Sequence, residues 1–134
     1  MAGRVVSVFV LAAAFATFAV TARPLANGDS EHDWPTIGHD PANTRSQPFE
    51  HRIRPENVDR LALKWMATTT GDVSGTPAVV DGAVYFGDFG GTLWKLDART
   101  GQVIWSHLVS DYTGIPADLA RTSPSLLGHT LIVG

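Results

Sequence analysis

The 134-residue chain contains no cysteine. This absence excludes disulfides, thiolate metal sites, CxxCH haem attachment and a cysteine-linked lipid anchor within this sequence. Charged residues are also few, at 17% of the chain, and the 10 basic and 13 acidic residues give a net charge of −3. Without a basic footprint, nucleic acid is not an expected partner.

The sequence also lacks a convincing amphipathic helix of useful length. It has instead short apolar runs separated by turn formers, among its 13 glycines and 8 prolines. Such a composition predicts an all-β chain with many turns. The length suffices for one ordinary domain with one hydrophobic core.

The N-terminus predicts a secretory signal peptide over residues 1–22. Arg4 precedes a nearly uninterrupted apolar run over residues 5–20, and small residues follow. That order is typical of a cleaved signal, here after Ala22, with Ala26 as the second choice. The alternative is an uncleaved anchor, but the run is shorter than the roughly 20 residues that a spanning helix needs. We therefore expect export to a bacterial periplasm and no membrane span after cleavage.

Residues 23–60 are expected to form a leader loop. The stretch DWPTIGHDPANTRSQPF, residues 33–49, contains three prolines and many turn formers, which disfavour helix. Four of its polar residues are His39, Asp40, Asn43 and Arg45. We interpret these four as residues that hold the loop by hydrogen bonds, in preference to a metal site or an acid–base pair.

Residues 61–134 are expected to form β-structure. Apolar residues alternate over 61–65, which is the period of a half-buried strand. Asp81-Gly82 predicts a hairpin turn between two β-rich runs. Gly90-Gly91 and Thr100-Gly101 then separate the strands that follow.

The chain contains an internal repeat. TPAVVDGAVYFG, residues 76–87, aligns with SPSLLGHTLIVG, residues 123–134, at an offset of 47, with proline, hairpin and final glycine in register. Trp65 and Trp105, each closing a short apolar strand, lie 40 residues apart. A period in the forties built from about four strands is typical of β-propeller blades. Because propellers close with about 4–8 blades, the sequence predicts the first blades of a longer ring.

The turn after the third predicted strand has a specific form. Each blade must stack on its neighbours, and we expect a tryptophan to cover the turn of the adjoining blade. Gly101 would permit that close approach because it has no side chain. Asp97 and Thr100 would cap the same turn by hydrogen bonds to its backbone.

Residues 82–105 closely resemble the repeat of the pyrroloquinoline quinone (PQQ) dependent dehydrogenases, the eight-bladed quinoprotein propellers. Their blade motif is Ala-x-Asp-x-x-Thr-Gly-x-x-x-Trp. Its matching positions here are Asp97, Thr100, Gly101 and Trp105, whereas Lys95 replaces the small residue.

Two further regions extend the resemblance. The leader is similar to the one in which Trp-Pro and Gly-His-Asp-x-x-Asn-Thr-Arg precede the first blade. Residues 74–88 and 109–125 are most similar to the polyvinyl alcohol dehydrogenase branch of the family.

The resemblance implies the oxidation of a secondary alcohol by PQQ, which is held beside a Ca²⁺ ion at the centre of the propeller. Electrons would then pass to a cytochrome c. The family's catalytic Asp and its metal ligands come from later blades. We therefore expect no catalytic residue and no metal ligand in this fragment, which alone would be inactive.

Five residues are candidates for cofactor contact. Arg121 matches a family arginine that contacts the quinone oxygens, and a guanidinium suits planar acceptors; the alternative is a solvated surface arginine. Thr122 and Ser123 are further hydrogen-bond donors or ordinary strand-start residues. Ser74 and Thr76 are weaker candidates. Methanol-oxidising relatives have a glutamate at the place of Ser74 and a vicinal cysteine pair, so this chain fits the polyvinyl alcohol type better.

Two other interpretations stay open. One is a non-catalytic PQQ-repeat β-propeller scaffold of the outer-membrane assembly type, against which the missing lipid-anchor cysteine and the leader both argue. The other is a short, non-functional gene product, whose unpaired strand edges would promote aggregation.

Overall fold

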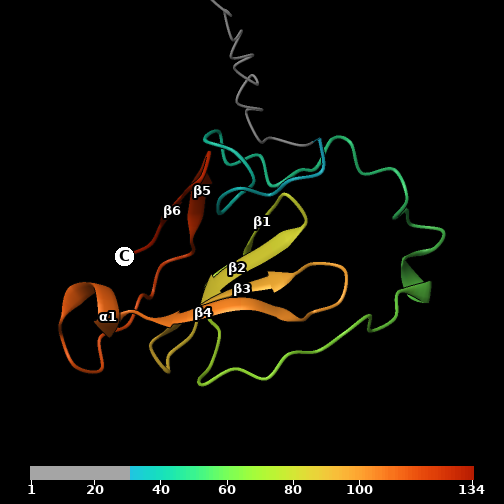
Figure 1. Ribbon diagram of the computed structural model, residues 1–134. Helices are drawn as coiled ribbons and strands as arrows, with labels where there is room; N and C mark the ends of the chain where they lie inside the picture. The colour runs from blue at the N-terminus through green and yellow to red at the C-terminus, as the bar shows by residue number, and fades with distance from the viewer. Residues whose placement is uncertain (1–30) are drawn as a thin grey trace, which may run out of the picture.

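The structure is a computed structural model of the chain and describes residues 31–134. The predicted signal peptide, with both of its cleavage positions, lies outside the described residues. The boundaries 1–22, 23–60 and 61–134 stay predictions. The described part consists of a long leader and two antiparallel sheets, joined by loops (Figure 1).

The larger sheet is a four-stranded meander in the order β1-β2-β3-β4. Its strands are β1 (Ala78–Val80), β2 (Ala83–Gly87), β3 (Thr92–Asp97) and β4 (Val103–Leu108). Each strand pairs antiparallel with the next one along the chain. This arrangement confirms the predicted blade of four antiparallel strands.

The smaller sheet is the start of a second blade. It pairs β5 (Ser125–Leu127) with β6 (Thr130–Ile132). Its register repeats that of the first hairpin: Ala78 faces Tyr85 in one, and Ser125 faces Ile132 in the other. The repeat predicted from the sequence is therefore a structural repeat with an identical strand register.

The Asp81-Gly82 turn closes the first hairpin as predicted. Both residues have positive φ, 50° and 71°. A two-residue turn of this kind matches the twist of the strands that it joins.

Helix is minor in residues 31–134. There it comprises one 3₁₀ turn, η1 (Val58–Arg60), and a single turn, α1 (Ser110–Thr113), between β4 and β5. The strand predicted over residues 61–65 is wrong, because within residues 31–134 this segment has no ladder partner. Leu61 and Leu63 are 62% and 80% exposed.

The two sheets pack through small apolar clusters. One contains Ala78, Val80, Ala83 and Tyr85, with Leu126 and Leu131 of the second blade packed against them. The indole of Trp105 contacts this cluster and also a second cluster, which contains Leu93, Val109 and Ala120. Trp105 therefore joins the two halves of a thin core.

Lys95 has a clear structural role at the position where the family motif has a small residue. Its Nζ lies 5.2 Å from the centroid of the Tyr85 ring. An ammonium over an aromatic face is attracted by the ring quadrupole. Tyr85 in turn makes an edge contact with Trp105, with ring centroids 6.3 Å apart. The substitution therefore adds a cation–π contact beside the core.

The turn between β3 and β4 behaves as the sequence predicts. The Oδ1 atom of Asp97 accepts hydrogen bonds from the backbone N–H of Arg99 (3.0 Å), and from the N–H (2.7 Å) and hydroxyl (2.8 Å) of Thr100. The Thr100 hydroxyl is the main cause of a lowered Asp97 pKa, followed by the Thr100 amide. Trp65 covers this turn and donates from Nε1 to the carbonyl of Ala98 at 3.0 Å.

Gly101 makes that tryptophan contact possible. It has φ +74°, and a Cβ at this position would lie 2.6 Å from the Trp65 ring. The turn therefore needs glycine both for its backbone conformation and for the space that the indole occupies.

We expect Gly101→Ala to destabilise the full-length protein by about 2 kcal/mol or more, because strain at positive φ adds to a clash. Gly82→Ala is the matched control, since Gly82 has φ +71° but nothing within 4 Å of its Cβ position. The control should cost only about 1 kcal/mol. Thermal and denaturant unfolding of both variants measure the difference, and equal losses would contradict the docking role of Trp65.

Candidate functional site

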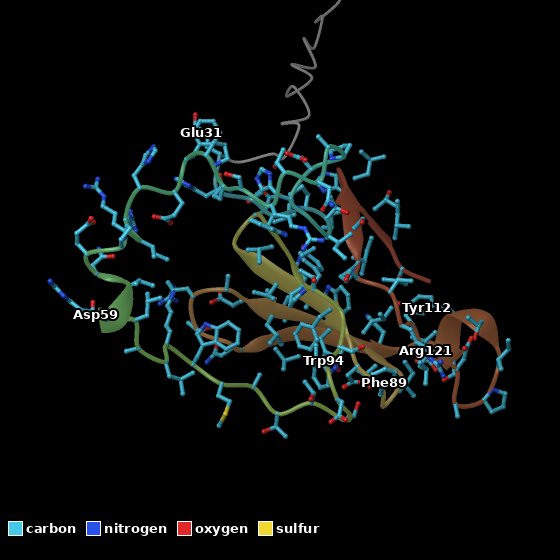
Figure 2. All side chains as sticks on the ribbon, turned by 180° about the vertical axis from the view of Figure 1, so that it is seen from behind. Glu31, Asp59, Phe89, Trp94, Tyr112 and Arg121 are labelled. Carbon is cyan, nitrogen blue, oxygen red and sulfur yellow. The ribbon has the colours of Figure 1, made fainter. Side chains whose placement is uncertain are left out.

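One end of the first sheet gathers the predicted site residues. Because neighbouring strands are antiparallel, β1 begins at the end where β2 and β4 finish, and β5 begins beside β1. We call this end the site end and the opposite one the turn end. Figure 2 shows Phe89, Tyr112 and Arg121 at the site end, far from Asp59.

A shallow depression lies at the site end. It is lined by Asp72, Ser74, Gly75, Gly87, Asp88, Phe89, Ala120, Arg121 and Thr122. Three of the five predicted contact residues therefore line one depression, and they come from the segments that precede β1 and β5.

The other two predicted residues connect those segments. The backbone N–H of Thr76 donates to the Oγ of Ser123 at 2.8 Å. The approach is close, since a Cβ at Gly75 would lie 3.4 Å from the Cα of Ser123. The structure thus brings all five candidates together from two segments, in which the bonded residues Thr76 and Ser123 are 47 positions apart.

The backbone beside Arg121 is fixed. The N–H groups of Arg121 and Thr122 donate to the carbonyl of Gly134 at 2.9 and 3.0 Å. The Thr122 hydroxyl accepts from the N–H of Gly134 at 2.8 Å. The Arg121 side chain is exposed and has no acceptor within residues 31–134, so its guanidinium is available to a ligand.

Asp88 organises the floor of the depression. It is 3% exposed, and both of its oxygens accept several hydrogen bonds. Oδ2 accepts from the N–H (2.9 Å) and hydroxyl (2.8 Å) of Thr70 and from Nε1 of Trp94 (2.9 Å). Oδ1 accepts from the N–H groups of Gly90 and Thr92, both at 3.0 Å.

The pKa of Asp88 reflects this environment. Burial alone would raise it, but the hydrogen bonds from Trp94, Thr92 and Thr70 outweigh burial and lower the pKa below its ordinary value of 3.8. Asp88 is therefore a fully coordinated carboxylate that fixes neighbouring segments. Asp88 is not among the residues predicted from the sequence. The available signal was an Asp directly after a predicted strand and two residues before Gly-Gly, a pattern that favours side-chain-capped turns.

Two glycines let the segments held by Asp88 touch. A Cβ at Gly71 would lie 2.3 Å from the nitrogen of Gly90, and a Cβ at Gly90 would lie 2.4 Å from the hydroxyl of Thr70. The connection that leads to Ser74 is thereby pressed onto the turn between β2 and β3. The segment that leads to Ser74 is therefore held against this turn by close packing as well as by the hydrogen bonds of Asp88.

A separate groove of about 560 Å³ lies between β4, α1 and β6. Its lining is mainly apolar and aromatic and includes Trp105, His107 and Tyr112. We assign it to packing between blades, since Trp105 and Leu93 in its wall belong to the core clusters.

The polar leader residues hold the loop, as expected. Asp40 accepts from the N–H of Thr44 at 3.1 Å and from its hydroxyl at 2.5 Å. Arg45 donates from its N–H to the carbonyl of Gly38 at 3.0 Å and from Nε to Asn43 at 3.4 Å. The hydrogen bonds from Thr44 to Asp40, first that of the hydroxyl and then that of the backbone N–H, lower the pKa of Asp40.

The donor set suits a planar, anionic ligand. A guanidinium with neighbouring hydroxyls on Ser74 and Thr122 matches carboxylate and carbonyl acceptors, which are the acceptors of the PQQ group implied by the resemblance. Across residues 31–134 no three His, Cys, Asp or Glu side chains are grouped to hold a metal ion. In the same range no helix has the length and apolar character needed to cross a membrane.

Comparison with known protein families gives one match over much of the chain. The family described as "Outer membrane protein assembly factor BamB" matches residues 62–134. The match covers both sheets and the turn on which Trp65 docks.

Curated relatives include alcohol dehydrogenases. The chain is 39% identical over 84 residues to quinohemoprotein alcohol dehydrogenase of Comamonas testosteroni, covering 61% of this chain and 12% of that protein. It is 35% identical over 77 residues to 1-butanol dehydrogenase (cytochrome c) of Thauera butanivorans, covering 56% and 11%. The chain therefore spans only about an eighth of these relatives.

A solved structure agrees with these matches. The crystal structure of the Comamonas testosteroni quinohemoprotein alcohol dehydrogenase superposes with a TM-score of 0.62 at 34% identity. The superposition covers 81% of this chain and 17% of that one. The two sheets are therefore one blade of a β-propeller and the beginning of the next.

Proposed function

The chain belongs to the β-propeller family whose model is described as "Outer membrane protein assembly factor BamB", and from its similarity to quinohemoprotein alcohol dehydrogenases we propose that it is the N-terminal part of a periplasmic PQQ-dependent alcohol dehydrogenase. One observation carries the proposal. Ser74 and Thr76 lie beside Arg121, Thr122 and Ser123 at the site end, and the guanidinium of Arg121 is available there.

The residues of this chain would bind and orient the cofactor. The oxidising chemistry would be supplied by PQQ when it is bound, as the acceptor of the hydride equivalent of the alcohol. Arg121 would neutralise a carboxylate or quinone oxygen, and the hydroxyls of Ser74 and Thr122 would donate further hydrogen bonds. Asp88 would keep these walls in place through Thr70 and the turn that follows β2.

We further propose a secondary alcohol as substrate, a cytochrome c as electron acceptor and Ca²⁺ beside the cofactor. The basis is the similarity of residues 74–88 and 109–125 to the polyvinyl alcohol dehydrogenase branch. Similarity to the 1-butanol dehydrogenase (cytochrome c) of Thauera butanivorans supports the acceptor. The calcium ligands and the catalytic Asp would come from other blades.

A non-catalytic scaffold is the second candidate. The description of the matching family as an outer-membrane assembly factor favours it. A scaffold of this kind needs a closed ring of blades but no cation facing a ligand at the site end, so cofactor binding separates the two candidates.

The test is a titration of the full-length secreted protein with PQQ and Ca²⁺. We expect saturable PQQ binding and dye-linked oxidation of a secondary alcohol that requires both additions. A folded ring that binds no PQQ and oxidises no alcohol would refute the enzyme and leave the scaffold.

A further inference from the structure

The leader contacts both sheets through one short segment, Asp33–Thr36. Trp34 forms a two-way bridge with Val79 of β1, with N–O distances of 2.6 and 2.9 Å. The next residue, Pro35, accepts a hydrogen bond from the N–H of Leu126 in β5 at 2.9 Å. Figure 1 shows this part of the leader lying across β1 and β5. We call the segment the leader bridge.

Side chains reinforce the leader bridge. The hydroxyl of Thr36 lies 2.6 Å from the hydroxyl of Ser125, the first residue of β5. The carboxylate of Asp33, which is 6% exposed, accepts from the N–H of Asp81 just after β1 at 3.2 Å. The leader bridge is thus hydrogen-bonded to β1 of the first blade and to β5 of the second.

The bridged positions are equivalent in the repeat. Val79 and Leu126 occupy the same place in their hairpins, facing Val84 and Leu131. Thr76 and Ser123, which form the direct bond at the site end, are also equivalent. The segments that contain β1 and β5 are therefore connected at two places, three residues apart along each segment.

Two separate connections between the blades restrict their relative orientation more than a single hydrogen bond does. Apolar contacts between the sheets are non-directional and allow sliding, whereas hydrogen bonds fix distance and direction. With the Thr76–Ser123 bond alone, β5 could pivot about its start. The leader bridge supplies the second tie and so fixes the angle between the blades.

We propose that the leader bridge is a positioning element that sets the spacing between Ser74–Thr76 and Arg121–Ser123, so that cofactor affinity depends on a segment outside the blades. The inference rests on the proposed function, because it takes these two segments as the halves of the PQQ site. Thr36 is the side chain through which it is tested, since its contact with Ser125 lies two residues from Ser123.

The experiment uses full-length protein and two readouts, the PQQ dissociation constant from fluorescence quenching and the Tm without cofactor. Thr36→Val removes the hydroxyl at nearly constant shape and should weaken PQQ binding about 3- to 10-fold, the effect of a small misplacement of binding groups. Thr36→Ser keeps the hydroxyl and should restore wild-type binding. Ser125→Ala should match Thr36→Val, and the double variant should be no worse than either alone.

Thr44→Val is the matched control. Thr44 lies in the same leader, and its hydroxyl bonds only Asp40 of that leader. It should leave the PQQ dissociation constant within about twofold.

The outcomes separate the two proposals. Wild-type protein that binds no PQQ would overturn the proposed function and this inference with it. If the wild type binds PQQ but Thr36→Val leaves the PQQ dissociation constant unchanged, the positioning role alone is overturned. The same holds if Thr44→Val weakens PQQ binding as much as Thr36→Val does.

Discussion

Replacing Arg121 by Gln should weaken PQQ binding to the full-length protein by about 10- to 100-fold, the effect expected when a charge-assisted hydrogen bond is lost. The reason is geometric as well as electrostatic. The Arg121 backbone is fixed through Gly134, and this exposed residue lines the depression together with Ser74 and Thr122. Equilibrium titration followed by cofactor fluorescence measures the change.

Arg121→Lys should fall between the wild type and Arg121→Gln, because an ammonium keeps the charge but loses the planar fork. Arg99→Gln is the matched control. It removes the same charge from an exposed arginine in the turn at the opposite end of the sheet. A loss of affinity in Arg99→Gln as large as that in Arg121→Gln would mean that net charge, and not a contact at the site end, determines binding.

Asp88→Asn should be the most destabilising single substitution at the site end, with a loss of about 3–5 kcal/mol, because several charge-assisted hydrogen bonds are weakened and buried donors are left without an acceptor. In the variant one carboxylate oxygen becomes an amide NH₂, which faces either the donors of Thr70 and Trp94 or those of Gly90 and Thr92, whichever way the amide turns. Thermal unfolding of the full-length protein measures the loss. Thr70→Val removes one of these bonds and should give a smaller loss of about 1 kcal/mol.

The pH dependence of the free energy of unfolding distinguishes an effect of the Asp88 charge from an effect of altered packing. Its folded pKa is lowered, so its contribution to the free energy of unfolding is complete above the ordinary value of 3.8 and is lost as the pH falls through the folded value. The gap between wild type and Asp88→Asn should therefore narrow below pH 3.8. Asp111→Asn, at an exposed position in α1, should change stability by less than about 0.5 kcal/mol at any pH. A gap that stays constant in acid would contradict this role for the Asp88 charge.

Local pattern was enough to predict the hairpins. The Asp81-Gly82 turn, the repeated register and the cap made by Asp97 all depend on residues close together in sequence, where side-chain period and turn chemistry act directly. The close approach at Gly101 also followed, because the repeat implied a neighbour that had to dock there.

Contacts between distant segments could not be predicted in the same way. Residues 61–65 carry the alternation of a strand, but alternation does not provide a ladder partner, and within residues 31–134 none lies beside them. The coordination of Asp88 depends on Thr70 and Trp94 converging from separate segments, which no spacing in the sequence reveals. The five site residues were recognisable only through a family resemblance, and their roles remain predictions.

The leader bridge also affects the order in which the protein assembles. Thr36 and Ser125 are separated by 89 residues, so the second attachment of the bridge must wait until the start of the second blade has left the ribosome and paired. Contacts of such long range close slowly, because the entropy of the intervening chain opposes them. The first blade can therefore fold as a local meander, whereas the leader completes its attachments only to a pair of blades. The leader can therefore form all of its contacts only when two adjacent blades have folded and packed together.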